Sequence, residues 1–144
     1  MDEQQMMQDR KERAELRAVR TLVGLTQQDL AAKFGVAIGD VSNWENAKKR
    51  HFPVPADVLD YVRRVKRFHD DEVARRADKI LDSGASEVTL TYWRSQPIYE
   101  RSGMPGYFSV ENGISIAVAS IVEYEGVRVE WEYPPVPVNP EQQG

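Results

Sequence analysis

Residues 25–46 read LTQQDLAAKFGVAIGDVSNWEN, and this stretch decides the fold. It predicts a short helix that begins after Thr26, where Asp29 three residues further on completes a variant of the capping box. Phe34-Gly35-Val36 ends that helix in a tight turn, because glycine accepts the left-handed backbone that such a turn requires. A further helix is expected from about Ile38 to Asn46. The stretch therefore predicts two short helices joined by a sharp turn.

Apolar side chains on the two helices are spaced to meet between them, and Ala31 is small where the helices would cross. The expected members of this small core are Leu30, Phe34, Val36, Val41 and Trp44. We expect Trp44 in this core rather than stacked on a base, and Glu45 paired with Arg17 or Arg20 of a preceding helix. A helical hairpin in an unrelated all-α domain is the plainer alternative.

Residues 13–62 resemble the Cro/C1-type helix-turn-helix family, also called the Xre family. The resemblance rests on LTQQDLAAKFGV at 25–36 and VSNWEN at 41–46. It implies a transcriptional regulator whose second helix of the pair, the recognition helix, enters the major groove of double-stranded DNA. It also implies that Gln27 contacts a phosphate and braces the recognition helix, with a plain polar residue of the first turn as the alternative.

The implied DNA-binding residues lie on or beside the recognition helix and at the start of the helix before it. They are Thr26, Gln27, Gln28, Ala37, Ile38, Asp40, Ser42, Asn43, Lys48, Lys49 and Arg50. Asparagine can pair with adenine and aspartate can accept from cytosine, so Asp40, Ser42 and Asn43 are candidates for base contacts. The three cations at 48–50 are expected near a phosphate strand. For all of these, an ordinary solvated polar surface is the competing interpretation.

The sequence departs from the family at the start of the recognition helix. Ala37 stands where Ser or Thr normally forms the cap, and Ile38 and Gly39 occupy positions that usually carry polar residues. Glycine inside a helix costs about 1 kcal/mol relative to alanine, so a loose helix start is expected. Direct readout would then rest on few base contacts, with DNA shape or ordering of the helix in the bound state contributing more to specificity.

Outside residues 25–46 the pattern predicts an α+β protein. A frayed terminus of eight residues precedes a helix over Arg10–Val23, whose apolar face comprises Ala14, Leu16, Val19, Leu22 and Val23. A helical stretch from Ala56 to about Asp82 follows, which His69-Asp70-Asp71 can split in two. Strands at 87–93 and 127–133 flank a loop over Arg101–Gly106 and a helix marked by the repeat Ile114, Ala117, Val118, Ile121 and Val122.

The expected organisation is an all-α helix-turn-helix domain of about five helices at 10–66, a connecting helix at 67–83, a small β-α-β dimerisation domain at 84–133, and a disordered tail at 134–144. Charge follows the same division. The chain has a net charge of −4, but residues 1–80 hold 16 of its 19 Lys and Arg. A mildly basic first half can approach phosphates, and the acidic second half has another task; two ordinary solubilising surfaces are the alternative.

Several functional classes find no support in the sequence. There is no cysteine, no lysine-bearing phosphate loop around Gly103-Met104-Pro105-Gly106, and no metal-ligand or triad pattern around His51 or His69. We therefore expect no enzyme activity, no cofactor and no metal. The acidic, polar first residues are unlike a secretory signal and no apolar run is long enough for a bilayer, so a cytoplasmic protein without membrane contact is expected.

A single helix-turn-helix makes too few contacts for tight operator binding, so we expect a homodimer, formed chiefly through residues 84–133, on a palindromic operator. This layout is similar to that of anti-CRISPR-associated phage autorepressors, which implies a repressor of a phage or mobile-element operon. One alternative is an antitoxin whose acidic part binds a partner protein. Another is a helix-turn-helix used only for protein contacts, which Ala37, Ile38 and Gly39 suggest.

Overall fold

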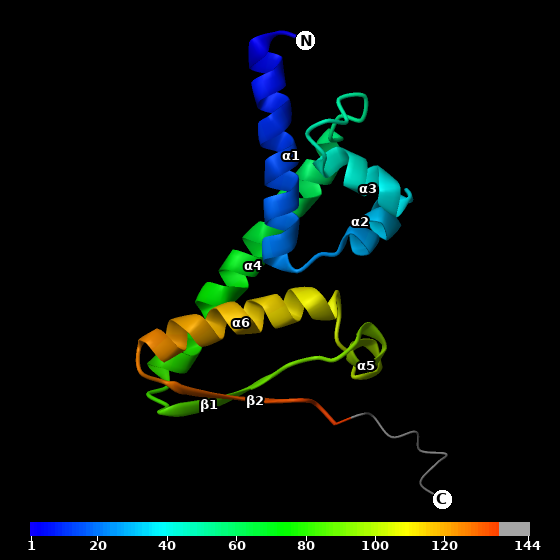
Figure 1. The fold of residues 1–144 in the computed structure, drawn as a ribbon. Helices are drawn as coiled ribbons and strands as arrows, with labels where there is room; N and C mark the ends of the chain where they lie inside the picture. The colour runs from blue at the N-terminus through cyan, green and yellow to red at the C-terminus, as the bar shows by residue number, and fades with distance from the viewer. Residues whose placement is uncertain (136–144) are drawn as a thin grey trace, which may run out of the picture. The chain divides into compact units, whose positions relative to one another are not determined.

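The computed structural model describes residues 1–135 of the 144-residue chain. The chain divides into two compact units, Met1–Phe68 and His69–Gly144. Its elements are α1 (Glu3–Val23), α2 (Gln27–Phe34), α3 (Ile38–Glu45), α4 (Ala56–Asp82), β1 (Glu87–Thr91), α5 (Gln96–Arg101), α6 (Phe108–Tyr124) and β2 (Arg128–Glu132) (Figure 1). The predicted α+β class, with the helix-turn-helix ahead of a small sheet, is confirmed.

Helix α1 begins at Glu3, so the expectation of a frayed terminus over the first eight residues is wrong. Asp2 Oδ1 accepts from the Gln5 backbone N–H at 2.8 Å, and Gln5 Oε1 accepts from the Asp2 N–H at 2.9 Å. This reciprocal pair satisfies two N–H groups at the helix start and allows the helix to begin there. The extra turns carry Asp9 and lead directly into Arg13.

The buried face of α1 differs from the predicted one. Leu16 and Val23 are fully buried as expected, but Leu22 is 52% exposed. Arg13 is only 1% exposed and Arg20 is half-buried. Since these two arginines alternate with Leu16 and Val23 at three- and four-residue spacing, they lie on the same side of the helix. The side of α1 that faces the rest of the unit therefore carries two apolar and two cationic side chains.

Helices α2 and α3 form the predicted turn. Thr26 Oγ1 accepts from the Asp29 N–H, and Asp29 Oδ2 accepts from the Thr26 N–H, both at 2.9 Å, which confirms the capping box. Gly35 has a φ of 65°, the left-handed conformation expected of it. The buried centre of the predicted small core consists of Leu30, Val41 and Trp44. Its edge consists of the half-buried Phe34 and Val36.

Helix α4 runs without a break, so His69-Asp70-Asp71 does not split it. These three residues interrupt the apolar pattern, but each of them can adopt helical dihedrals, so the backbone hydrogen bonding of the helix continues through them. The first unit, residues 1–68, therefore contains α1, α2, α3 and the first part of α4, four helices where about five were expected. Arg63 of α4 anchors α1 through two hydrogen bonds to the Glu15 carboxylate, at 2.6 and 2.8 Å.

The second unit contains the predicted β-α-β arrangement. Strands β1 and β2 run parallel, with Val88 opposite Val129 and Leu90 opposite Trp131. Parallel neighbours cannot be joined by a hairpin, so α5 and α6 form the crossover between them. Helix α6 lies along both strands (Figure 1).

Helix α5 was not predicted. Ser95 caps it, since its Oγ accepts from the Ile98 N–H at 3.4 Å, and Pro97 lies in its first turn. Serine followed by a proline is a helix-start signal that the sequence analysis overlooked.

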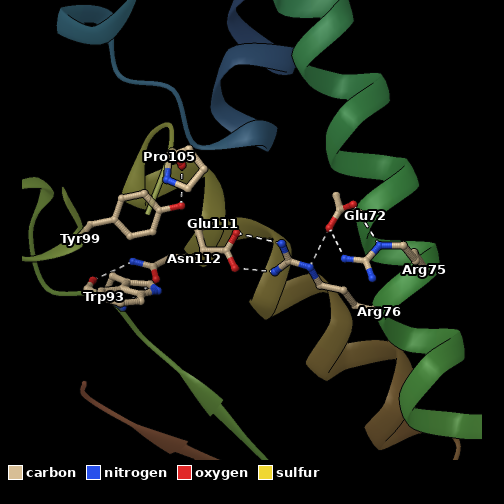
Figure 2. A network of polar contacts seen from close by, with 8 residues as sticks. All are labelled: Glu72, Arg75, Arg76, Trp93, Tyr99, Pro105, Glu111 and Asn112. Carbon is tan, nitrogen blue, oxygen red and sulfur yellow. Dashed lines mark hydrogen bonds and ion pairs between the residues drawn. The ribbon is translucent and has the colours of Figure 1, made fainter. Parts of the chain in front are cut away.

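Buried and half-buried polar groups tie the elements of the second unit together (Figure 2). Asn112 of α6 donates to the Trp93 carbonyl and accepts from the Trp93 N–H, both at 2.8 Å. Arg76 of α4 bridges the carboxylates of Glu72 on its own helix and Glu111 on α6. Hydrogen bonds from Arg75 and then Arg76 lower the pKa of Glu72 from 4.5 to about 2. The Glu72 carboxylate therefore stays charged at any ordinary pH.

The expected disordered tail at 134–144 lies almost wholly outside the described residues, which end at Pro135. Pro134 and Pro135 belong to no helix or strand.

Candidate nucleic-acid interface

The start of α3 is built without a side-chain cap, as the sequence predicts. Ala37 has extended backbone dihedrals and supplies no capping hydrogen bond. Asp40 compensates in part, because its Oδ2 accepts from the Ala37 N–H at 3.0 Å. A carboxylate in the first turn also interacts favourably with the positive end of the helix dipole. Asp40 therefore has a structural task that accounts for one of its oxygens, whatever else it contacts.

The outer face of α3 carries several of the residues proposed for base contacts. Val41 and Trp44 are buried against the rest of the unit, so the opposite side of the helix faces outward. Ile38 is 49% exposed and Ser42 is exposed, while Asn43 is half-buried. Asp40 is also half-buried, but it lies one turn before Trp44 and so at the edge of the buried side. The outward part of the helix thus presents one large apolar side chain and two short polar ones.

The start of α2 presents the other predicted group. Thr26 is exposed, but its hydroxyl oxygen accepts the capping hydrogen bond. Gln28 is exposed and Gln27 half-buried. Backbone N–H groups at a helix start attract anions, so the exposed glutamine and the first turn of α2 are compatible with a nearby phosphate.

A compact turn follows α3 directly and carries three cations. We call Lys48, Lys49 and Arg50 the basic loop; all three are exposed. Asn46 shapes the turn, since its Oδ1 accepts from the Lys48 N–H at 2.9 Å and its carbonyl accepts from the Lys49 N–H at 3.0 Å. Within residues 1–135 the side chains of the basic loop form no ion pair, which leaves their charge available to an anion.

Two arginines of α1 hold the C-terminal end of α3. Arg20 donates to both carboxylate oxygens of Glu45 and to the Leu25 carbonyl at 3.0 Å, so it joins α3 to the segment before α2. Of the two partners predicted for Glu45, the structure selects Arg20, and Arg17 is exposed. The other arginine is Arg13, to which the sequence analysis assigned no role. It donates to backbone carbonyls at the end of α3 and in the following turn.

The chemistry of this surface is that of binding. It offers neutral hydrogen-bonding groups on a helix and exposed positive charges beside it. On a duplex, contacts of the first kind can read bases and contacts of the second kind can fix the register. Among the described residues, no three His, Cys, Asp or Glu side chains are grouped to hold a metal ion. In the same part of the chain, no helix is long and apolar enough to cross a membrane.

Comparison with known proteins agrees with this geometry. Residues 16–53 match the model of a helix-turn-helix family, over a segment that begins within α1 and ends after the basic loop. No curated protein matches the chain. Residues 16–53 are therefore a helix-turn-helix of the Cro/C1 type, the DNA-binding module of transcription regulators.

Proposed function

We propose that this protein regulates transcription by binding a specific double-stranded DNA sequence with α3 in the major groove. The observation that carries the proposal is the position of the basic loop, which follows directly on the exposed polar face of α3. In such a geometry Ser42 and Asn43 meet base edges while Lys48, Lys49 and Arg50 meet the phosphates beside the groove. Thr26, Gln27 and Gln28, at the start of α2, meet a phosphate across the groove.

Charge supports the same assignment of the two units. Residues 1–68 hold 13 Lys and Arg against 10 Asp and Glu, whereas residues 69–144 hold 6 against 13. The first unit is therefore attracted to DNA and the second unit is repelled by it. This division favours a separate task for the second unit over the DNA contact itself.

We assign that task to self-association, so that a homodimer spans two half-sites of a palindromic operator. Among the described residues, which end at 135, the second unit has a sheet of two strands, and each strand has one edge without a neighbouring strand. Three aromatic side chains at the sheet are exposed: Tyr92, Trp131 and Tyr133. The ring of Tyr92 contacts each of the other two edge to face. Exposed aromatic side chains of this kind are enriched at protein interfaces. Repression of the protein's own phage or mobile-element operon, in the cytoplasm, is the role that the layout of the sequence favours.

Selection from random duplex DNA tests the proposal. We expect the protein to enrich a palindrome, and Asn43→Ala to relax the preference at one position of each half-site by about 1–3 kcal/mol. Lys48→Ala is expected to weaken binding to all sequences alike and to reduce the slope of log K against log salt by about 0.9. Lys79→Ala removes an exposed lysine from the second unit and is the matched control.

The possible results separate the alternatives. Uniform binding without enrichment would favour a helix-turn-helix used for other contacts, and unchanged binding in both variants would overturn the placement of the interface. Stable co-purification of a basic protein with the second unit, in place of self-association, would support the antitoxin alternative.

A further inference from the structure

The buried side chain of Arg13 donates hydrogen bonds to five acceptors in the first unit. Its Nε donates to Asp9 Oδ2 at 2.9 Å, four residues earlier on α1. Its Nη1 donates to the carbonyls of Asn43 at 2.9 Å, Trp44 at 3.2 Å and Asn46 at 3.1 Å, and its Nη2 donates to the Lys49 carbonyl at 3.0 Å. One guanidinium group therefore joins α1 to the last turn of α3 and to the turn that bears the basic loop.

The acceptors explain why an arginine occupies this position. The last carbonyls of a helix have no partner within the helix. A carbonyl oxygen in a turn has two lone pairs, so it can accept a second hydrogen bond beside the one that closes the turn. Guanidinium is planar, always charged and has five N–H donors, so a single residue can satisfy several carbonyls that converge from different directions. Asp9 supplies the opposite charge that a buried cation requires. The side chain is 1% exposed, so it cannot itself reach a DNA phosphate.

The same carbonyls determine the path of the basic loop. The Asn46 carbonyl accepts from Arg13 and also from the Lys49 N–H. The Lys49 carbonyl accepts from Arg13 and also from the Phe52 N–H at 2.9 Å. Both of these backbone hydrogen bonds therefore end on carbonyl oxygens that Arg13 also binds. The backbone is fixed by α1, while the cationic side chains remain free to point outward.

From these contacts we propose that Arg13 is a positioning residue for DNA binding, which fixes the basic loop beside α3 so that its cations meet the phosphate strand. The proposal rests on the proposed function. A loop already held in its bound path loses less conformational freedom on binding, and affinity rises for that reason. The residues that match the helix-turn-helix family begin at Leu16, so Asp9 and Arg13 lie ahead of the shared segment. The N-terminal half of α1 therefore supplies the two residues that hold the backbone of the basic loop.

The test combines Arg13→Met with replacement of the whole basic loop, Lys48→Ala/Lys49→Ala/Arg50→Ala. We expect Arg13→Met to weaken binding to the selected duplex about tenfold and to reduce the salt slope, although the exposed cations are unchanged. In the protein without a basic loop, Arg13→Met should weaken binding less than twofold further. The proposal would be overturned if Arg13→Met weakened binding by the same factor with and without the basic loop. It would also be overturned if Arg13→Met left the salt slope unchanged.

A second measurement follows the loop itself. Trypsin cleaves after lysine and arginine, and we expect Arg13→Met to accelerate cleavage after residues 48–50 at least fivefold relative to cleavage after Lys11, because a turn that is not held opens more often. Equal acceleration at both places would indicate a general loss of stability and would overturn the proposal. If the wild-type protein selects no DNA, the proposed function fails, yet cleavage of the loop still decides whether Arg13 holds it.

Two further variants guard against an unfolded product. Asp9→Asn keeps the guanidinium group and removes its charge partner, and Arg13→Lys keeps the charge with fewer donors, so both should give intermediate affinity and intermediate cleavage rates. Glu15→Gln removes the charge partner of Arg63 between α1 and α4, away from α3 and the basic loop, and controls for a change in the packing of α1 alone. Its DNA affinity should match that of the wild type, and an affinity as low as that of Arg13→Met would contradict a positioning role.

Discussion

Glu45, the last residue of α3, forms a two-point ion pair with Arg20 of α1. Arg20 Nε and Nη2 donate to the two carboxylate oxygens at 2.5 and 3.1 Å, and the Glu45 side chain is only 4% exposed. Because Glu45 belongs to α3 and Arg20 also binds the Leu25 carbonyl, this pair fixes α3 relative to α1 and to the segment before α2.

We predict that Glu45→Gln lowers the free energy of unfolding by about 2 kcal/mol, since it leaves the Arg20 guanidinium without its charge partner in a mostly buried site. Urea denaturation measures the loss. The double variant Arg20→Met/Glu45→Met is the control, and it should be more stable than Glu45→Gln because no charge is left unpaired. A single variant within 0.5 kcal/mol of wild type, a surface-like effect, would contradict this account.

Two glycines of the helix-turn-helix should respond in opposite ways to alanine. Gly39 lies inside α3 without a positive φ, and an added Cβ would meet nothing within 4 Å. We expect Gly39→Ala to stabilise the protein by about 1 kcal/mol. Gly35, at a φ of 65°, also has open space around it, but alanine there should cost about 1–2 kcal/mol because of the left-handed backbone. Thermal unfolding of the two variants measures both changes in stability. A less stable Gly39→Ala variant would contradict the assignment of Gly39 to helix α3.

Acid should weaken the second unit through Glu72, the carboxylate bound by Arg75 and Arg76 (Figure 2). Its pKa is about 2 in the folded chain and 4.5 as the ordinary value, so its contribution to stability is complete above pH 4.5 and is lost as the pH falls toward 2.

We expect the free energy of unfolding of Glu72→Gln to depend less steeply on pH over this range than that of wild type. Glu123→Gln, which changes an exposed carboxylate of α6, is the control. Parallel pH profiles for wild type and Glu72→Gln would contradict the prediction. Glu15, whose pKa is lowered by Arg63, leaves some acid dependence in every variant.

Self-association should depend on the exposed aromatic side chains of the second unit. We expect the wild-type protein to sediment as a dimer at micromolar concentration and Trp131→Ala to sediment as a monomer, because a central aromatic residue commonly contributes 2 kcal/mol or more to an interface. Phe52→Ala is a matched control, since Phe52 and Trp131 are both 42% exposed and Phe52 lies in the first unit. A monomeric wild-type protein would remove the proposed homodimer.

The features that the sequence predicts correctly are those encoded by neighbouring residues. Thr26 and Asp29 cap each other across three positions, and Gly35 carries its backbone conformation in its own chemistry. The capping pair of Asp2 and Gln5 and the start of α5 at Ser95 are encoded by neighbouring residues in the same way, so the sequence also carries these two signals.

Arg13 could not be predicted in this way. Four of its five acceptors are backbone carbonyls 30 to 36 positions further along the chain. Every residue has a carbonyl, so no residue type marks the partner, and a mid-helix arginine looks like a solvated side chain. Its position in one row with Leu16 and Val23 was the single clue. Which residues of α3 read bases also depends on the DNA, whose path the protein sequence does not contain.

The parallel pairing of β1 and β2 has a consequence for synthesis of the chain. Glu87 is made 41 residues before its partner Arg128, and the whole crossover must be in place before the strands can pair. Domains generally fold in the order in which they leave the ribosome, so residues 16–53 can form their helices while the sheet is still incomplete. A chain released before Arg128 would carry the whole helix-turn-helix segment and a single β-strand without its partner.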